Sequence, residues 1–192
     1  AASDVYKRQG MYVREDRAQQ IYYGDIWYTQ GGALLAPENG TIDGQDDFDP
    51  SKTVVGYTPG TIWQTTVEGW AADGKIKEAR ATGDQTESIV ALQNGKIDAF
   101  LTDSPVVENL MKFQPETLKG LKLCSNYKDT EAEIGRIAPS VKFGNEDFMK
   151  DINKVVAEMR DEGVLDQIYE KYGLDPKLHA ITNDQKDNGL NK

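Results

Sequence analysis

The sequence predicts an α/β protein on three observations. Between residues 53 and 103, short apolar strands alternate with helical patterns. Two of these strands end in polar turns that open a helix. Two further extended stretches, near 21–35 and 134–138, lie on either side of the alternating region. Strand–helix–strand alternation implies a mostly parallel sheet with right-handed crossovers. The two flanking stretches would join two bodies as a hinge.

The elements of the alternating region follow from local signals. Trp63, Val67 and Trp70 recur at helical spacing, and Asp84 begins a capping box. Asn94-Gly95 is typical of a left-handed helix end, and Ser104 is expected to cap the next helix with Pro105 in its first turn. We predict strands at 53–57, 77–82 and 97–102, and helices at 62–72, from Asp84 to Asn94, and from 104 onward.

The last third of the chain is predicted to be helical. Asn145 is expected to cap a long helix that Gly163 ends, and a shorter helix follows. One apolar stripe, favoured as core rather than as a partner surface, comprises Phe148, Ile152, Val155, Val156 and Met159. The shorter helix carries Leu165, Ile168, Tyr169 and Tyr172. From Asp175 the chain turns polar, so 175–192 is expected to be a frayed tail.

The amino-acid composition argues against several classes of protein function. The formal net charge is −10 and the pI is near 4.6, which argues against nucleic acid as a partner. No stretch approaches the roughly 18 apolar residues of a membrane helix, so we expect a soluble chain. Cys124 is the only cysteine and His179 the only histidine, so the sequence has few of the residues that a zinc site or a Ser-His-Asp triad requires. We expect no cofactor and no metal.

The acidic loop 37–51 suggests a calcium site at first sight, because it carries Asp43, Asp46, Asp47 and Asp49. A calcium loop needs oxygen ligands at alternate positions, a glycine at the sixth and a glutamate at the twelfth. The segment does not supply them in register. We therefore favour a solvated loop.

Asp103 is the strongest candidate for a binding residue. It ends the apolar run 97–102, and ligands of open α/β sheets gather outside the carboxyl ends of strands. The strand 53–57 ends in the turn Thr58-Pro59-Gly60-Thr61, which offers backbone donors at a helix start. An anion at one strand end and donors at the other would suit a ligand that carries both an ammonium and a carboxylate.

Four segments, in order, carry a resemblance to a known family. They are Gly10–Arg17 with Tyr22–Tyr28, Val55–Thr61, Ala91–Ala99 with Asp103–Pro105, and Glu162–Tyr172. Over residues 10–174 the chain resembles bacterial extracellular solute-binding proteins of the polar amino-acid-binding type, the components that deliver substrate to an ABC transporter. The resemblance implies a type II periplasmic-binding-protein-like fold, with two α/β lobes joined by a hinge.

The resemblance also implies a domain organisation. Residues 1–31 and 133–174 would be the later part of a first, incomplete lobe, 32–132 a complete second lobe, and 175–192 a polar tail. We expect the natural chain to begin upstream, since 1–9 show no clear periodicity and no secretory signal. The implied protein is periplasmic and monomeric, and its partners are a small amino acid and a membrane permease.

Site residues follow by resemblance, position by position. Arg17 matches the arginine that clamps the ligand α-carboxylate, and Gly60 and Thr61 match the turn whose N–H groups meet the same carboxylate. Asp103 matches the acid that binds the α-ammonium. Gly10 and Tyr12 match positions that touch the ligand, although the family prefers Ser or Thr at position 12 and Thr where Arg14 stands. Trp63 is a candidate apolar wall.

Other interpretations remain open on sequence alone. Arg17 could be an ordinary surface cation, and Asp103 could simply cap the helix that follows it. Relatives of this fold include cyclohexadienyl dehydratases, in which Asp103 would act as acid or base, but no histidine or paired carboxylate lies near the motifs. The same lobes also occur as ligand-sensing domains of receptors. We favour a binding protein that performs no chemistry.

Overall fold

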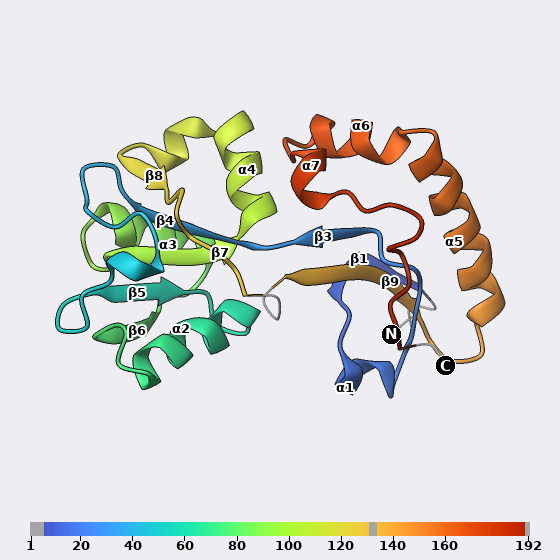
Figure 1. Ribbon diagram of the computed structural model, residues 1–192, viewed down its shortest axis with the longest axis horizontal. Helices are drawn as coiled ribbons and strands as arrows, with labels where there is room; N and C mark the ends of the chain where they lie inside the picture. Colours follow the sequence, from blue (N-terminus) through green and yellow to red (C-terminus); the bar gives the residue numbers. More distant parts are fainter. Residues whose placement is uncertain (1–5, 131–133, 191–192) are drawn as a thin grey trace. The chain divides into compact units, whose positions relative to one another are not determined.

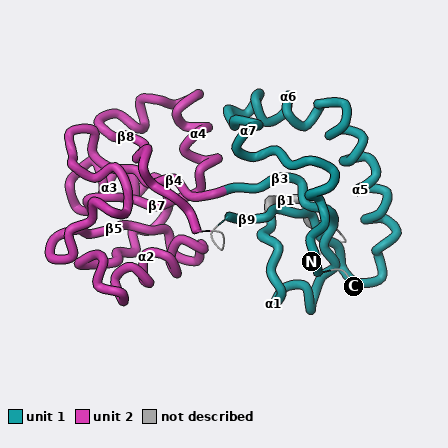
Figure 2. The backbone as a smooth tube through the Cα atoms, viewed as in Figure 1, with its two compact units in different colours: residues 1–30, 134–192 teal, residues 31–133 magenta. Residues whose placement is uncertain are grey.

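The chain divides into two compact units. The computed structural model describes residues 6–130 and 134–190. Unit 1 comprises Ala1–Gln30 and Ile134–Lys192, and unit 2 comprises Gly31–Glu133 (Figure 2). The expected lobe boundary at Glu133 and the first residues of the chain lie outside the described residues. That unit 1 is part of an incomplete lobe stays a prediction.

Unit 2 is built on a five-stranded sheet in the order β6-β5-β7-β4-β8 (Figure 1). The strands are β4 (Gly32–Pro37), β5 (Val54–Tyr57), β6 (Glu78–Ala81), β7 (Ala99–Asp103) and β8 (Leu121–Leu123). Strands β6, β5 and β7 are parallel, whereas β4 is antiparallel to both β7 and β8. The sheet is therefore mixed, but β4 alone runs against the other four strands, so the predicted mostly parallel sheet differs from the structure only at β4. β4 precedes the strand–helix alternation, whereas β8 follows α4 and runs in the same direction as β7.

Helices cover both faces of this sheet. They are α2 (Ile62–Ala72), α3 (Gln85–Gln93) and α4 (Ser104–Phe113), with short 3₁₀ turns η1 (Gln45–Asp47) and η2 (Pro115–Leu118). Trp63 and Val67 of α2 pack with Leu34 and Leu101 in one core. The neighbouring strand residues, Leu35 and Phe100, pack with α3 and α4 in a second core. Alternate side chains of a strand point to opposite faces, so each central strand serves both cores.

The helix ends of unit 2 follow sequence signals in part. The Asp84 carboxylate accepts a 2.9 Å hydrogen bond from the Glu87 N–H, which confirms the predicted cap of α3. Gly95 ends that helix with φ of 65°. The prediction for α4 was wrong by one residue, because Asp103 stands at the cap position and Ser104 already belongs to the helix. Asp103 makes no side-chain cap bond there.

Unit 1 is organised around one strand, β9 (Gly135–Val141). Antiparallel to it lie β1 (Tyr6–Tyr12), β2 (Tyr22–Tyr23) and β3 (Tyr28–Gln30). The helices of the unit are α1 (Glu15–Ala18), α5 (Glu146–Asp161), α6 (Val164–Lys171) and α7 (Pro176–His179). The segments that pair with β9 come from residues 6–30, more than a hundred positions earlier in the sequence. The unit is thus assembled from two distant parts of the chain.

The long helix α5 buries only part of the predicted stripe. Met149 and Val156 are its buried residues, whereas Phe148 is 48% and Val155 is 54% exposed. Asn145 occupies the predicted cap position, but its side chain makes no cap hydrogen bond. Instead the Glu146 carboxylate accepts from the Gly144 N–H at 2.8 Å. Helical periodicity found the helix, but the depth to which each apolar residue is buried depends on its neighbours.

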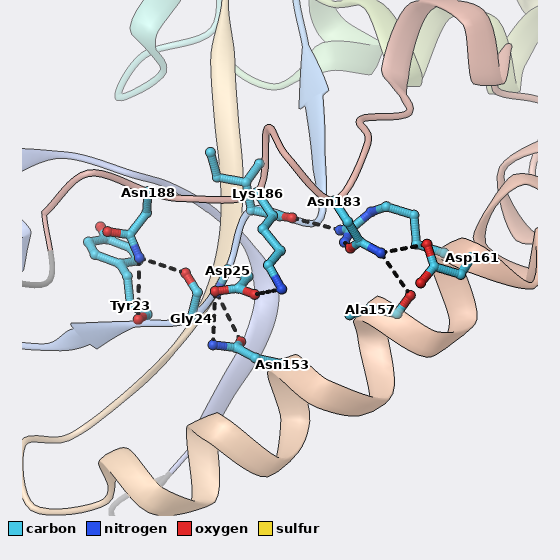
Figure 3. A network of polar contacts seen from close by, with 11 residues as sticks. Tyr23, Gly24, Asp25, Asn153, Ala157, Asp161, Asn183, Lys186 and Asn188 are labelled. Carbon is cyan, nitrogen blue, oxygen red and sulfur yellow. Dashed lines mark hydrogen bonds and ion pairs between the residues drawn. The ribbon is translucent and has the colours of Figure 1, made fainter.

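The C-terminal residues are packed, in contrast to the expected frayed tail. We call residues 180–190 the C-terminal strap. His179, just before it, is 1% exposed, and its Nδ1 lies 2.9 Å from the Thr29 carbonyl oxygen. Within the strap, Asn188 is 3% exposed and donates to the Gly24 carbonyl at 2.8 Å (Figure 3). Polar composition misled the prediction, because these polar groups find partners in the folded unit.

A second group of contacts holds the strap against α5. The Asn183 amide donates to the Ala157 carbonyl at 3.2 Å and to the Asp161 carboxylate at 2.6 Å (Figure 3). Nearby, Asp25 accepts from the Asn153 amide at 3.0 Å and pairs with Lys186 at 3.3 Å. Strap, helix and the segment after β2 therefore form one polar network.

No helix in residues 6–130 and 134–190 combines the length and apolarity needed to cross a membrane.

Candidate functional site

Asp103 and Trp63 meet in unit 2. Asp103 is the last residue of β7 and is partly exposed, while Trp63 lies in the first turn of α2 and is 1% exposed. The indole Nε1 donates to the Asp103 Oδ1 at 2.9 Å. Trp63 is a predicted apolar wall, whereas in the structure its ring lies in the core and its polar edge contacts the carboxylate. This geometry favours a positioning role for Trp63.

Gly60 and Thr61 form the turn into the same helix. Gly60 has φ of 80°, a left-handed conformation that glycine adopts without a steric penalty, and Thr61 stands at the cap position of α2. The Thr61 hydroxyl donates to the Thr58 carbonyl at 2.8 Å and so fixes the turn. The Gly60 N–H donates to the Gln64 side-chain oxygen at 3.0 Å. An anion that accepts a hydrogen bond from the Gly60 N–H would replace the Gln64 side-chain oxygen.

Three residues that sequence reasoning missed lie beside Trp63. The Asp129 carboxylate accepts from the Gly32 N–H with both oxygens at 3.0 Å and from the Tyr127 hydroxyl at 2.8 Å. A Cβ on Gly32 would lie 2.9 Å from both the Trp63 ring and the Tyr127 hydroxyl oxygen. We call Gly32, Tyr127 and Asp129 the crossing clasp, since they tie the first residues of unit 2 to its last. Of these residues only Gly32 carries a sequence signal, because it follows Gly31 and paired glycines indicate a flexible point.

In unit 1 the candidate Tyr12 contacts a buried tyrosine. Tyr23 is fully buried, and its hydroxyl donates to the Tyr12 carbonyl at 2.9 Å. The Tyr12 hydroxyl in turn accepts from the Gln30 amide at 2.6 Å. Gly10 lies in β1 where the pairing with β9 shifts register between Lys7 and Met11. Tyr23 and Gln30 were not singled out by sequence, since an aromatic or amide in an extended stretch carries no specific signal.

Arg17 is exposed on α1 close to that tyrosine. Burial raises the pKa of Tyr23, and the Arg14 backbone and the Arg17 charge act in the opposite direction. Arg14 itself makes a two-pronged pair with Asp16, with N–O distances of 3.0 Å. Hydrogen bonding to Arg14 lowers the pKa of Asp16. Arg14 is therefore engaged within its own turn, which distinguishes it from the candidate Arg17.

Two other polar features of unit 2 have structural explanations. The Asp43 carboxylate accepts from the Ser125 hydroxyl and the Asn126 amide, both at 2.8 Å, so it fastens the acidic loop to the segment after β8. Among residues 6–130 and 134–190, no three His, Cys, Asp or Glu side chains gather as metal ligands. Cys124 is buried, and burial raises the pKa of its thiol to about 11. A thiol in that environment is a poor nucleophile at neutral pH.

Comparison with known proteins identifies the family. The model of the family described as bacterial extracellular solute-binding proteins, family 3, matches residues 7–175. The chain belongs to this family. A probable histidine-binding protein of Neisseria gonorrhoeae is 26% identical over 163 residues, which are 85% of this chain and 58% of that protein. The L-cystine-binding protein TcyJ of Escherichia coli is 29% identical over 161 residues, 82% of this chain and 56% of that protein.

Solved structures of solute-binding proteins show the same fold. The second substrate-binding domain of a putative amino acid ABC transporter from Streptococcus pneumoniae aligns with a TM-score of 0.67 at 24% identity, over 85% of this chain and 70% of that one. An ancestral arginine-binding protein bound to arginine aligns with a TM-score of 0.66 at 26% identity, over 84% and 68%. The chain is thus an α/β protein of the type II periplasmic-binding fold, and it spans less than two thirds of the curated relatives described above.

Proposed function

We propose that this chain is part of an extracytoplasmic binding protein that captures a small amino acid and delivers it to an ABC transporter. Membership of the solute-binding family supports the general role. The names of the relatives, histidine-binding and L-cystine-binding, support an amino acid as ligand. These names denote binding proteins, so we infer capture rather than catalysis. A periplasmic location and a permease partner follow from the same proposal.

The observation that carries the proposal is the Asp103 carboxylate at the end of β7, held by the Trp63 indole at 2.9 Å. A fixed carboxylate at a strand end suits an α-ammonium group, because charge-assisted hydrogen bonds are stronger than neutral ones. The backbone N–H groups of Gly60 and Thr61, at the start of α2, suit a carboxylate. In this proposal Arg17 binds the same carboxylate with its guanidinium, and Gly10 and Tyr12 line the remaining surface.

The proposal has a quantitative consequence. A micromolar ligand corresponds to about −8 kcal/mol, and a hydrogen bond to a charged group contributes roughly 1.5–3 kcal/mol. Loss of either Asp103 or Arg17 should therefore weaken binding by about 10-fold to 150-fold. Ligand binding would favour whichever conformation makes the most contacts with it, which is how such a ligand shifts a conformational equilibrium.

Isothermal titration calorimetry with L-histidine, L-arginine, L-glutamine and L-cystine tests the proposal. Asp103→Ala and Arg17→Ala should each lose affinity for whichever amino acid binds. Matched controls are Asp73→Ala, which removes an exposed carboxylate paired with Lys75, and Lys150→Ala, which removes an exposed cation paired with Asp147. Controls should bind as the unaltered chain does. Equal affinity in Asp103→Ala would overturn the site, and absence of binding by every amino acid in a chain extended upstream would overturn the function.

A double-mutant cycle tests whether both residues act on one ligand. If Arg17 and Asp103 hold opposite ends of the same molecule, the double variant should bind that molecule more weakly than either single variant, because each substitution removes a different contact. A double variant that binds no more weakly than Asp103→Ala would remove Arg17 from the site.

A further inference from the structure

Trp63 is an unusual neighbour for a candidate binding carboxylate. Its ring belongs to the core that includes Leu34, Val55 and Leu101, and 99% of the residue's surface is excluded from solvent. Its single polar atom, Nε1, lies 2.9 Å from the Asp103 Oδ1. A buried indole needs a hydrogen-bond acceptor, and a carboxylate at a strand end needs an orientation. This one bond satisfies both requirements.

The position of the ring is itself enforced. A Cβ on Gly32 would lie 2.9 Å from two carbons at the far edge of the indole six-membered ring, so the ring packs against bare backbone. The Gly32 N–H donates to both oxygens of Asp129 at 3.0 Å, and Tyr127 donates to the same carboxylate. The crossing clasp therefore holds the backbone against which the indole rests. The Asp103 carboxylate is thus held by a hydrogen bond from the Trp63 indole, which packs against Gly32. The Gly32 backbone is held in turn by its hydrogen bonds to Asp129.

We propose that Trp63 is the positioning residue of the binding site, which orients the Asp103 carboxylate from the core and links it through Gly32 to the crossing clasp. The inference rests on the proposed function, because it assigns Asp103 the ligand ammonium. Trp63 acts through Asp103 and does not itself contact ligand. A carboxylate fixed before binding loses less rotational freedom when the ligand arrives, so preorganisation raises affinity.

One arm of the test needs no ligand. In a spectrum of the full chain labelled with ¹⁵N at the tryptophan indoles, Trp63 is assigned by the signal that Trp63→Phe removes. Asp103→Asn keeps the size of the side chain and replaces a charged acceptor by a neutral one. It should shift the Trp63 indole signal toward that of a more weakly hydrogen-bonded N–H and leave the Trp70 signal in place. An unmoved Trp63 signal would overturn the proposal.

The second arm measures affinity with the same amino-acid panel. Replacing Trp63 by benzothienylalanine removes the N–H and keeps the shape of the ring, so the unfolding midpoint should change little while binding weakens by about tenfold or more. Trp63→Phe should give at least the same loss. Trp70→Phe is the control for a general disturbance of the core, since Trp70 lies on the same helix and its ring contacts Phe48 and Tyr127. Unchanged affinity with benzothienylalanine would overturn the positioning role.

The two arms separate the two ideas. If no amino acid binds the unaltered chain extended upstream, the proposed function fails, and the indole signal still decides whether Trp63 orients Asp103. If amino acids bind and Trp70→Phe loses as much affinity as the benzothienylalanine chain, the effect belongs to the core and the positioning role is overturned.

Discussion

Asn188 should contribute more to the stability of unit 1 than its place near the end of a polar segment suggests. It is 3% exposed, and its amide donates to the Gly24 carbonyl at 2.8 Å and to the Tyr23 carbonyl at 3.5 Å (Figure 3). Its side-chain oxygen accepts from the Leu190 N–H at 2.8 Å. Asn188→Ala removes these bonds and leaves a carbonyl without its partner in a buried environment.

The magnitude follows from the burial. A buried polar group that loses its partner costs about 1–3 kcal/mol, so we expect unit 1 to lose roughly 2 kcal/mol of unfolding free energy. Amide hydrogen exchange resolves the units separately, and this loss corresponds to about 30-fold less protection in the strands that pair with β9. A convenient reporter is the Gly24 N–H, which donates to the Pro139 carbonyl at 2.9 Å.

Asp187→Ala is the matched control for this experiment. Asp187 is an exposed neighbour on the same strap, and surface substitutions usually change stability by less than about 0.5 kcal/mol. Protection in unit 2 serves as an internal reference, because the substitution touches only unit 1. Equal and small effects of Asn188→Ala and Asp187→Ala would refute the view that the strap is an integral part of unit 1.

Three further predictions concern unit 2. Burial raises the pKa of the Cys124 thiol from 9.0 to about 11, so its stabilising contribution is complete below about pH 9 and is lost as the pH rises toward 11. Urea unfolding at pH 8 and pH 11 should show this loss, Cys124→Ala should lack it, and Ellman's reagent should react with the folded thiol far more slowly than with the unfolded one. Gly32→Ala should destabilise by about 1–3 kcal/mol, because the new methyl meets the Trp63 ring at 2.9 Å, and an unchanged melting temperature would contradict this packing. Hydrogen bonding from Ser125 lowers the pKa of Asp43, so its contribution is present above the ordinary value of 3.8 and is lost as the pH falls through the lowered pKa. Asp43→Asn should flatten that part of an acid-unfolding curve, and an unaltered curve would show that the contact carries no stability.

Local signals predicted the helices of unit 2 well. Helix α2 has the predicted bounds, and Asp84 caps α3 as expected, because a cap and an apolar periodicity are encoded within a few residues. Asp103 was placed at a strand end by the same kind of signal, and the structure has it there. Its role as a ligand residue stays a prediction.

Distant contacts could not be predicted. The Asp25 backbone N–H donates to the Asn153 side chain at 2.9 Å across 128 positions of sequence, and Asn188 reaches Gly24 across 164. A polar residue is predicted to be solvent-exposed when its partner is unknown, so the C-terminal residues were predicted to be a frayed tail. The contact between Trp63 and Asp103 was missed for a related reason, because helical spacing indicates that a ring is buried but not which acceptor its N–H meets.

The pairing of β9 also constrains the order in which the protein is built. Unit 2 is a continuous stretch of chain, so all of its strands have left the ribosome before residue 135 emerges. The early segments β1, β2 and β3 must wait for β9, since each of them pairs with it. At about 5–20 residues per second, synthesis of the chain between β3 and β9 takes about 5–20 s, and during that time the three early strands lack their partner. A folding defect in unit 2 would therefore lengthen the time during which β1, β2 and β3 expose unpaired strand edges to other chains.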